Sequence, residues 1–317
     1  MSTTTLLVIL GVLVLVYLGV EFFVKKERSS SFRAELVEVD TSKISGINIY
    51  GDDTLNLQRG DAGLWQVENA NGKMVEAQSS SVQNLLNTLM SIKPSRIATN
   101  DKAKWSEYSV DTAGTRVIVH EGKKKTLDLI VGRFGFDQDA MQQQQMQMGG
   151  RGMQQFYTYV RLNDEDEVYV ADQFMGMSLS SDATSYRNTL VWQLTTDSIS
   201  SIQFEYPADS GFVLQRTNEL WQVNGAEADS ANVMQYLNKI RNLNASEFAD
   251  DVEIASLNQP FVRLDIDSKQ SAALQFHQHP RYNLLVTSSR SPEVVYADPD
   301  STLYKRVVVG QSQLTTE

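Results

Sequence analysis

The chain of 317 residues contains no cysteine and few histidines and prolines. The absence of cysteine excludes disulfide bonds, thiolate zinc sites, iron–sulfur clusters and cysteine nucleophiles. Three histidines leave little material for imidazole chemistry. The net charge is −11, because 39 acidic residues outnumber 28 basic ones. We do not expect such an acidic chain to bind nucleic acid, whose phosphates attract cations.

Charge is also missing from the first fifteen residues of a long apolar run at 6–24, LLVILGVLVLVYLGVEFFV. As a helix this run is about 28 Å long, close to the roughly 30 Å thickness of the hydrocarbon core of a bilayer. Glu21 falls in the last turn, where its carboxylate reaches the interface. No basic residue precedes the run and no small-residue cleavage site follows it, which argues against a cleaved signal peptide. We expect residues 1–26 to form a transmembrane anchor with its flanks and residues 27–36 a linker.

The sequence carries competing signals for the side of the membrane on which the rest of the chain lies. Lys25, Lys26, Arg28 and Arg33 follow the apolar run, and the positive-inside rule would place the large domain in the cytoplasm. Long domains, however, translocate largely regardless of such charges. The residues alone leave both orientations open.

The remaining sequence repeats itself. The motif Leu-Trp-Gln-Val occurs at 64–67 and again at 220–223, each time a few residues after a Gln-Arg pair. Downstream, apolar positions align at a constant offset: Ala77, Val82, Leu86 and Leu89 with Ala228, Val233, Leu237 and Ile240. Internal duplication of this kind indicates two homologous units, which we place at residues 37–190 and 191–317.

Both units show the same order of structural signals. Alternating runs rich in β-branched and aromatic residues, separated by Gly, Asp and Asn turns, predict antiparallel strands. These runs lie at 44–50, 53–60, 63–69, 115–121, 125–132, 156–162 and 167–172 in the first unit, and at 199–206, 211–217, 220–225, 260–267, 271–278, 283–289 and 293–298 in the second.

A helix is predicted after the third strand of each unit. Apolar residues follow the 3.6-residue period at 82, 85, 86, 89 and 92, and again at 233, 236, 237, 240 and 243. Ser79 and Ser230 are the expected N-caps. The predicted fold class is therefore α+β: two homologous units of mainly antiparallel sheet, each with one packed amphipathic helix, plus one N-terminal transmembrane helix.

Two tryptophans at equivalent strand positions, Trp65 and Trp221, could bury their rings or stack on a ligand. Their place inside predicted strands favours a role as core anchors. Two histidines, His277 and His279, would share one face of a strand and could form half of a metal site. Pro280 follows at once and no third ligand is visible, so solvated edge histidines are the favoured interpretation.

Residues 138–155 are rich in methionine and glutamine, have no apolar period and have no counterpart in the second unit. We interpret this segment as a long disordered hairpin loop. Its thioethers are weak candidates for Cu(I) ligands, and they would equally suit an adaptable apolar docking surface. The methionines concerned are Met141, Met146, Met148 and Met153. With no catalytic motif in the sequence, we predict no catalytic residue, no cofactor and no resident metal.

The chain resembles the bacterial family called domain of unknown function 4340. The resemblance rests on the order of short motifs after an N-terminal anchor: Leu129–Gly132 (Leu-Ile-Val-Gly), Tyr159–Arg161 (Tyr-Val-Arg), Val168–Val170 (Val-Tyr-Val) and Tyr186–Leu190 (Tyr-Arg-Asn-Thr-Leu). Members of this family are often encoded beside ABC-transporter subunits of the gliding-motility type. That association implies an accessory role at the cell envelope and favours an extracytoplasmic domain.

We therefore expect a single-pass inner-membrane protein that is not an enzyme. It would bind the bilayer through residues 6–24 and act as an accessory or interaction protein of the bacterial cell envelope, associated with an ABC transporter complex. Tethering raises the effective concentration of a module for other membrane proteins without new contacts. Two alternatives remain: a hydrolase of an envelope polymer with a site between the repeats, and a copper-binding protein that uses the methionine segment.

Overall fold

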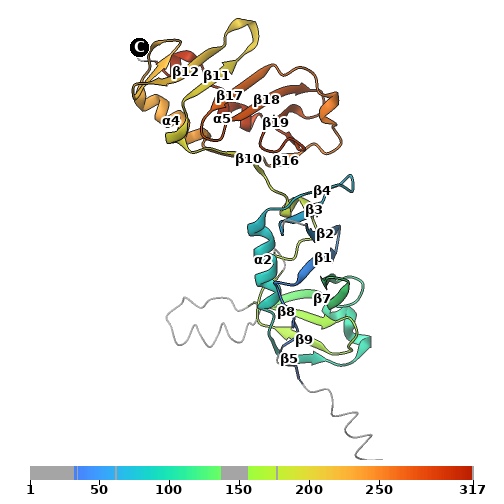
Figure 1. The fold of residues 1–317 in the computed structure, drawn as a ribbon. Coiled ribbons are helices and arrows are strands. Elements are labelled where there is room, and N and C mark those ends of the chain that lie inside the picture. Colours follow the sequence, from blue (N-terminus) through green and yellow to red (C-terminus); the bar gives the residue numbers. More distant parts are fainter. Residues whose placement is uncertain (1–31, 34, 61–62, 137–155, 176–177, 316–317) are drawn as a thin grey trace, which may run out of the picture. The chain divides into compact units, whose positions relative to one another are not determined.

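The structure, a computed structural model, describes residues 32–33, 35–60, 63–136, 156–175 and 178–315. The chain forms two compact units (Figure 1). Unit 1 comprises the described part of Met1–Glu68 together with Val75–Tyr186, and unit 2 comprises Asn69–Met74 together with the described part of Arg187–Glu317. None of the described helices is long and apolar enough to cross a membrane, and the predicted anchor at 6–24 lies outside the described residues.

Unit 1 is built on a nine-stranded sheet with the order β4-β3-β2-β1-β6-β7-β8-β9-β5. Its elements, in chain order, are β1 (Ile44–Tyr50), β2 (Thr54–Arg59), β3 (Trp65–Glu68), β4 (Met74–Glu76), helix α2 (Ser79–Met90), β5 (Pro94–Thr99), the 3-10 helix η1 (Lys102–Tyr108), β6 (Thr115–Glu121), β7 (Lys124–Phe136), β8 (Phe156–Leu162), β9 (Val168–Ala171) and η2 (Ala183–Tyr186).

Unit 2 is built on a second nine-stranded sheet, β14-β13-β12-β11-β17-β18-β19-β20-β16, and a two-stranded sheet of β10 and β15. Its elements are β10 (Leu190–Gln193), η3 (Thr196–Ser198), β11 (Ser201–Glu205), η4 (Pro207–Asp209), β12 (Phe212–Thr217), β13 (Leu220–Val223), β14 (Ala226–Glu227), α4 (Ser230–Ile240), β15 (Asn242–Asn244), β16 (Glu247–Phe248), η5 (Ile254–Ser256), β17 (Val262–Asp267), β18 (Ala272–His279), β19 (Asn283–Ser288), β20 (Val295–Ala297), α5 (Thr302–Val307) and η6 (Gln311–Gln313).

The two large sheets share one topology. In each, four strands come before the helix, and a short strand after the helix, β5 or β16, crosses to the far edge and pairs with the last strand. The repeated residues also keep their register, since Arg59 faces Trp65 and Arg216 faces Trp221. The predicted α+β class with mainly antiparallel sheets is confirmed. The break between the units follows Tyr186, and the predicted domain ranges stay a prediction.

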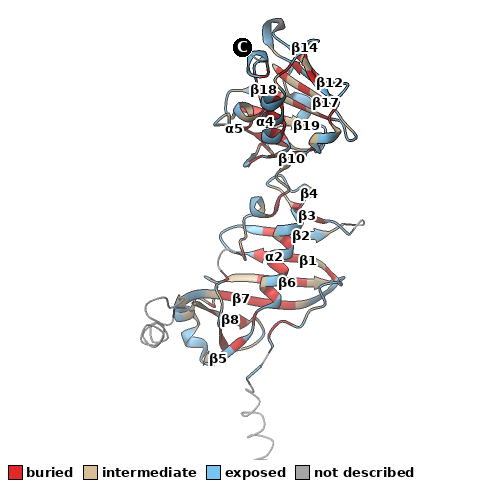
Figure 2. Ribbon diagram, turned by 90° about the vertical axis from the view of Figure 1, so that its left-hand side faces the viewer, coloured by how far each residue is buried: buried red, intermediate tan, exposed pale blue. Residues whose placement is uncertain are grey.

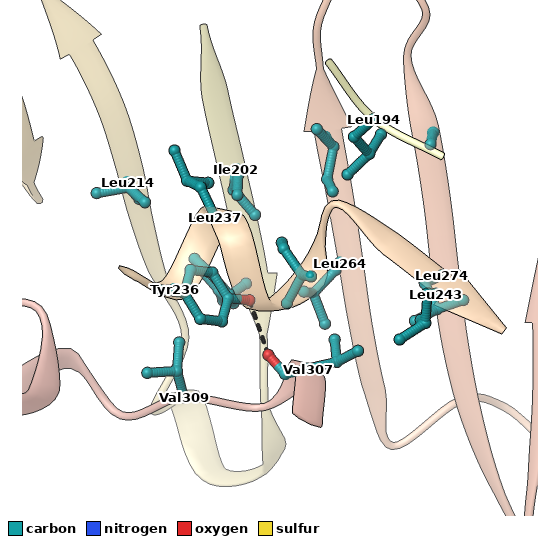
Figure 3. Close-up of a cluster of buried hydrophobic side chains, with 14 of the residues drawn as sticks. Leu194, Ile202, Leu214, Tyr236, Leu237, Leu243, Leu264, Leu274, Val307 and Val309 are labelled. Atoms are coloured by element: carbon teal, nitrogen blue, oxygen red, sulfur yellow. Dashed lines mark hydrogen bonds between the residues drawn. The ribbon is translucent and has the colours of Figure 1, made fainter. Parts of the chain in front are cut away.

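The main core of each unit lies between one face of its sheet and a long helix, and in unit 2 the short helix α5 adds Leu303 and Val307 to that core. Val82, Leu85, Leu86 and Leu89 of α2 are buried against unit 1, as their 3.6-residue spacing predicts. In unit 2, Val233, Tyr236, Leu237 and Ile240 of α4 are buried in the same way. Figure 3 shows this second core, in which the Tyr236 hydroxyl donates a hydrogen bond of 2.7 Å to the carbonyl oxygen of Val307.

The opposite face of each sheet carries a second, smaller apolar cluster. In unit 1, Ile130 alternates with the core residues Leu129 and Val131, so its side chain points to the other face. There it packs with Val110 and Val168, beside η1. The corresponding cluster of unit 2 joins Ala249, Leu285, Val295 and Ala297. Buried residues therefore line both faces of each sheet, near the β5 edge in unit 1 and near the β16 edge in unit 2. Figure 2 marks the buried residues along the strands in red.

The two main helices differ in their capping. The predicted caps Ser79 and Ser230 are wrong by one residue, because each is the first residue of its helix. The N-cap of α4 is Asp229, whose carboxylate accepts hydrogen bonds from the backbone N–H groups of Ala231 and Asn232. The N-cap of α2 is Gln78, whose side chain makes no capping hydrogen bond.

This difference gives a matched test of capping. Asp229→Ala removes two hydrogen bonds to otherwise unpaired helix N–H groups, so we expect it to lower the free energy of unfolding by about 1 kcal/mol. Gln78→Ala, at the equivalent position of α2, removes no cap and is expected to change the stability by less than about 0.5 kcal/mol. Urea unfolding followed by circular dichroism measures both. Equal losses would contradict the assignment.

A buried carboxylate anchors the outer face of unit 1. Asp128 on β7 accepts two hydrogen bonds of 2.8 Å from Arg116 and one of 2.6 Å from Lys125, and its side chain is 5% exposed. Burial by itself raises the pKa of this carboxyl, but the hydrogen bonds from Arg116 and Lys125 outweigh burial and lower the pKa below its ordinary value. In unit 2, Arg263 pairs with Asp265 in a more exposed bidentate contact.

Asp128→Asn should therefore destabilise the protein in a pH-dependent way. Removing the charge weakens three charge-assisted hydrogen bonds, and because Arg116 and Lys125 are 41% and 43% exposed and can turn to water, we expect a loss of about 1–3 kcal/mol at neutral pH. A lowered folded-state pKa means that the stabilisation is present above the unfolded value of about 3.9 and is lost as the pH falls through the folded value. The difference from wild type should thus shrink below about pH 4.

Asp265→Asn is the control for this prediction. Its ion pair is partly exposed, so the expected loss is about 1 kcal/mol or less. Urea unfolding at several pH values compares the two variants. A loss at Asp128 that does not depend on pH would show that its charge contributes nothing.

Candidate functional site

The two histidines considered as metal ligands have structural contacts, and the expectation of a solvated side chain is wrong for His277, which is 4% exposed. The Nδ1 atom of His277 lies 2.7 Å from the carbonyl oxygen of Asn258, and its Nε2 atom lies 3.4 Å from the hydroxyl of Thr287. The Nδ1 atom of His279 accepts hydrogen bonds of 3.3 Å from the backbone N–H groups of Arg281 and Tyr282. Among the described residues, no three His, Asp or Glu side chains are grouped so that they could hold a metal ion.

Two tryptophans and four methionines are also candidate ligand-binding residues in the sequence. Trp65 and Trp221 are 8% and 5% exposed and belong to the two main cores, which leaves no ring face for a ligand. The guanidinium of Arg59 lies 5.2 Å from the ring centroid of Trp65. Four methionines proposed as weak copper ligands lie outside the described residues: Met141, Met146, Met148 and Met153.

An open hollow of ≈ 610 Å³ lies on unit 1, between the β1–β2 turn and the segment before β6. Its walls are Gly51, Asp52, Thr112, Ala113, Gly114, Thr115, Leu179, Ser180, Ser181 and Ser185. Among these lining residues, Asp52 is the one ionisable side chain. A pair of carboxylates, which acid–base hydrolysis of a glycosidic bond requires, is not present in this hollow.

The family motifs hold η1 against the outer face of the sheet. A Cβ atom on Gly132, at the end of the Leu-Ile-Val-Gly motif, would lie 2.2 Å from the carbonyl oxygen of Tyr108 and 2.7 Å from Val110. Glycine is therefore required for the backbone of η1 to approach β7. The chain turns away after η1 through Ser109, which has a left-handed backbone.

The arginine of the Tyr-Val-Arg motif fixes the same segment from the other side. Arg161 is 3% exposed, and its guanidinium lies 3.7 Å from the ring centroid of Trp105. It donates hydrogen bonds of 3.0–3.1 Å to four carbonyl oxygens, those of Val110, Leu162, Asn163 and Glu165. Burial lowers the pKa of this guanidinium, and nearby carboxylates oppose the shift. Arg161 is therefore a structural residue.

The Tyr-Arg-Asn-Thr-Leu motif is likewise structural. Tyr186 is 3% exposed, and its hydroxyl donates a hydrogen bond of 3.2 Å to the carbonyl oxygen of Ser178. Arg187 is also buried. Its guanidinium lies 3.5 Å from the ring centroid of Phe248 and donates a 2.7 Å hydrogen bond to the Asp250 carboxylate.

Three tyrosines are in contact where η1 packs on β8: Tyr108 of η1 and Tyr157 and Tyr159 of β8. The rings of Tyr108 and Tyr159 are 4.6 Å apart between centroids, and those of Tyr157 and Tyr159 are 5.4 Å apart. Burial raises the pKa of the Tyr159 hydroxyl to about 12, and a hydrogen bond with Tyr157 adds to the shift. Tyr159 is therefore protonated at neutral pH.

The other face of the same hairpin exposes a group of phenylalanines. Phe134, Phe136 and Phe174 are 55%, 49% and 41% exposed. The ring of Phe174 lies 4.9 Å from that of Phe134, edge to face, and 5.8 Å from that of Phe156. Phe136 faces Phe156 across the β7–β8 pair. We call these four residues the phenylalanine cluster.

A hydrogen-bonded support holds the phenylalanine cluster in place. The hydroxyl of Thr158 donates a 2.7 Å hydrogen bond to the carbonyl oxygen of Gln173, the residue before Phe174. The Gln173 side chain accepts a hydrogen bond from the hydroxyl of Ser91 at the end of α2. Exposed aromatic side chains gathered on a rigid support are typical of protein-binding surfaces.

Sequence reasoning did not identify this surface. The sequence predicts a strand that contains Phe156, Tyr157 and Tyr159, but the strand pattern alone does not say which of its faces a neighbouring element covers. Phe134 and Phe136 extend β7 beyond the predicted strand end at 132, because a register shift after Val131 continues the pairing. The available signal was the high density of aromatic residues on both sides of the methionine segment.

Gly132→Ala tests how η1 is attached. The added methyl group would overlap the Tyr108 carbonyl oxygen, so we expect a loss of about 1–3 kcal/mol in stability and faster hydrogen exchange in residues 102–110. Gly46→Ala, on β1, meets only an ordinary contact of 3.4 Å and serves as the control. Hydrogen-exchange mass spectrometry distinguishes the two. Unchanged exchange at 102–110 in Gly132→Ala would contradict the close approach.

Comparison with known proteins gives one match. A family model described as domain of unknown function (DUF4340) matches residues 65–260, which include all four motifs. No curated protein and no solved structure matches the chain. The match covers more than half of the sequence and contains both main helices, the buried Arg161 and the segment with Tyr186 and Arg187. The chain therefore belongs to the family of domain of unknown function 4340.

Proposed function

We propose that this protein is a non-catalytic, membrane-anchored accessory protein of the bacterial cell envelope that binds a subunit of an ABC transporter complex. The observation that carries the proposal is the phenylalanine cluster. Three of its rings are 41–55% exposed, whereas most large apolar side chains of unit 1 are buried. Water contact with grouped aromatic rings is unfavourable, and covering them with a partner removes that cost.

The chemistry of the described residues supports binding rather than turnover. The arginines of the family motifs are buried and bonded to carbonyl oxygens, a ring or a carboxylate, so they stabilise the fold. The ring nitrogens of His277 and His279 are hydrogen-bonded to backbone groups. Burial raises the pKa of the hydroxyls of Tyr159, Tyr186 and Tyr236, which keeps these side chains neutral and unreactive at physiological pH.

The membrane anchor supports the choice of partner. Residues 6–24 have the length and apolarity of a single span. A tethered domain meets membrane proteins at a high effective concentration, so a modest exposed surface is sufficient for association. The family resemblance favours an extracytoplasmic domain, and the basic residues after the span favour the opposite side. Protease accessibility in spheroplasts decides between these orientations.

Site-specific cross-linking tests the proposal. A photoreactive phenylalanine analogue placed at Phe136, within the cluster, should form cross-links in native membranes to subunits of an ABC transporter, identified by mass spectrometry. Phe134→Ser combined with Phe174→Ser removes two exposed rings, and we expect it to reduce the yield of these cross-links by at least about tenfold, equivalent to about 1.4 kcal/mol.

The control replaces two exposed leucines outside the cluster. Leu64 and Leu220 are 58% and 55% exposed, and Leu64→Ser with Leu220→Ser should leave the cross-links unchanged. Both double variants should unfold near the wild-type temperature, because the four residues are between 41% and 58% exposed. Recovery of no transporter subunit at position 136 would overturn the proposal, and turnover of a small substrate by the purified protein would favour the hydrolase instead.

A further inference from the structure

Two arginines beside the tyrosines of unit 1 have free hydrogen-bond donors. Arg96 on β5 lies with its guanidinium 5.8 Å from the ring centroid of Tyr157, and Arg133 on β7 lies 5.6 Å from that of Tyr159. Both arginines are exposed. Within the described ranges, neither side chain has an ion-pair or hydrogen-bond partner, in contrast to Arg116 and its bidentate contact with a carboxylate.

The four side chains form one continuous row. Arg96, Tyr157, Tyr159 and Arg133 follow one another with separations of 5.8, 5.4 and 5.6 Å. Register places them on the outer face of the sheet, because Arg96 and Tyr159 both pair with Val170. Tyr108 of η1 supports the row from the side, at 4.6 Å from Tyr159. We call these residues the arginine–tyrosine row.

The row has the chemistry of a carboxylate receptor. An arginine held near an aromatic ring keeps its charge and its forked N–H donors, and the ring reduces the freedom that binding would otherwise remove. The fork matches the two oxygens of a carboxylate. Arg96 and Arg133 are unpaired positive charges in a chain whose net charge is −11, so the row is a local positive site on an acidic protein.

We propose that the arginine–tyrosine row binds an acidic peptide segment of a protein partner. Arg96 and Arg133 would each take a side-chain carboxylate, while the intervening part of the peptide packs on the rings of Tyr157 and Tyr159. Tyrosine and arginine are the residues enriched at the centres of protein interfaces. The inference names the chemistry of a partner and therefore rests on the proposed function as a binding protein.

Peptide binding to the full-length protein in detergent tests the inference. The probe is a short fluorescein-labelled peptide of alternating glutamate and leucine, followed by fluorescence anisotropy. Arg96→Gln with Arg133→Gln should raise its Kd by at least about tenfold, because two charge-assisted contacts are lost. The matched control removes two exposed basic side chains elsewhere, Lys104→Gln with Arg241→Gln, and should change Kd by less than about twofold.

Two further arms identify the interaction. Arg96→Lys with Arg133→Lys keeps the charge and loses the fork, so most of the affinity should be lost; wild-type affinity here would overturn the inference. Equal losses in the Gln pair and its control would also overturn it, since they would indicate nonspecific attraction. Displacement of the peptide by phosphatidylglycerol added to the detergent micelles or by inorganic phosphate would assign the row to a lipid headgroup or to free phosphate instead.

The same variants separate this inference from the proposed function. The cross-linking at Phe136 uses the phenylalanine cluster on the opposite face of the hairpin. If the peptide does not bind while transporter subunits are still recovered at Phe136, the acidic-peptide inference alone fails. If neither experiment gives a partner, both proposals fail.

Discussion

The guanidinium of Arg161 is the constraint on which the exposed surfaces of unit 1 depend. A buried charge is costly unless its donors are satisfied, and Arg161 meets this condition with four carbonyl oxygens and the face of Trp105. These contacts join β8, the turn that follows it and η1 into one assembly. Loss of any one of these hydrogen bonds would leave a buried N–H donor of Arg161 unsatisfied, which is costly, so the segment is held in place. The position of η1 then sets that of Tyr108, which packs on Tyr159.

Unit 2 reaches the same architecture with different residues. Thr115 faces Val131 in unit 1, and Val262 faces Phe276 in unit 2, so the next residues, Gly132 and His277, are equivalent. Gly132 permits close approach of the covering segment by having no side chain. His277 instead contacts that segment through its ring and the carbonyl oxygen of Asn258. A histidine considered as a metal ligand is thus a substitute for a glycine in packing the covering loop.

Much of the architecture can be predicted from the sequence, because the internal repeat shows the pattern of each strand or helix in two separate segments. The Leu-Trp-Gln-Val strands and the stripes of α2 and α4 appear in both halves, and the structure places them in equivalent registers. β5 was missed because it begins with Pro94 and is mostly polar, as suits an edge strand. The sequence does not predict the phenylalanine cluster or the arginine–tyrosine row. Alternation of apolar and polar residues indicates that a strand has two faces, but it does not show which part of a face η1 covers.

A single register shift accounts for both surfaces of unit 1. β18 and β19 pair without interruption from Leu274 to His279, whereas β7 and β8 shift between Val131 and Phe134. The shift sets Gly132 and Arg133 opposite one residue of β8, which is the geometry of a β-bulge. Beyond it, Phe134 pairs with Thr158 and so returns to the core face, where the sheet continues past the helix-covered region.

The bulge also explains why unit 2 has neither surface. Arg133 occupies the extra position and lies near Tyr159 on the outer face, beside the entry of η1. The strand registers make Leu285 of unit 2 equivalent to Tyr159 of unit 1. Leu285 is buried in the small apolar cluster of unit 2. The hairpin with the bulge presents phenylalanines on one face and the exposed Arg133 on the other, so one irregular pairing gives two units of the same topology different surfaces.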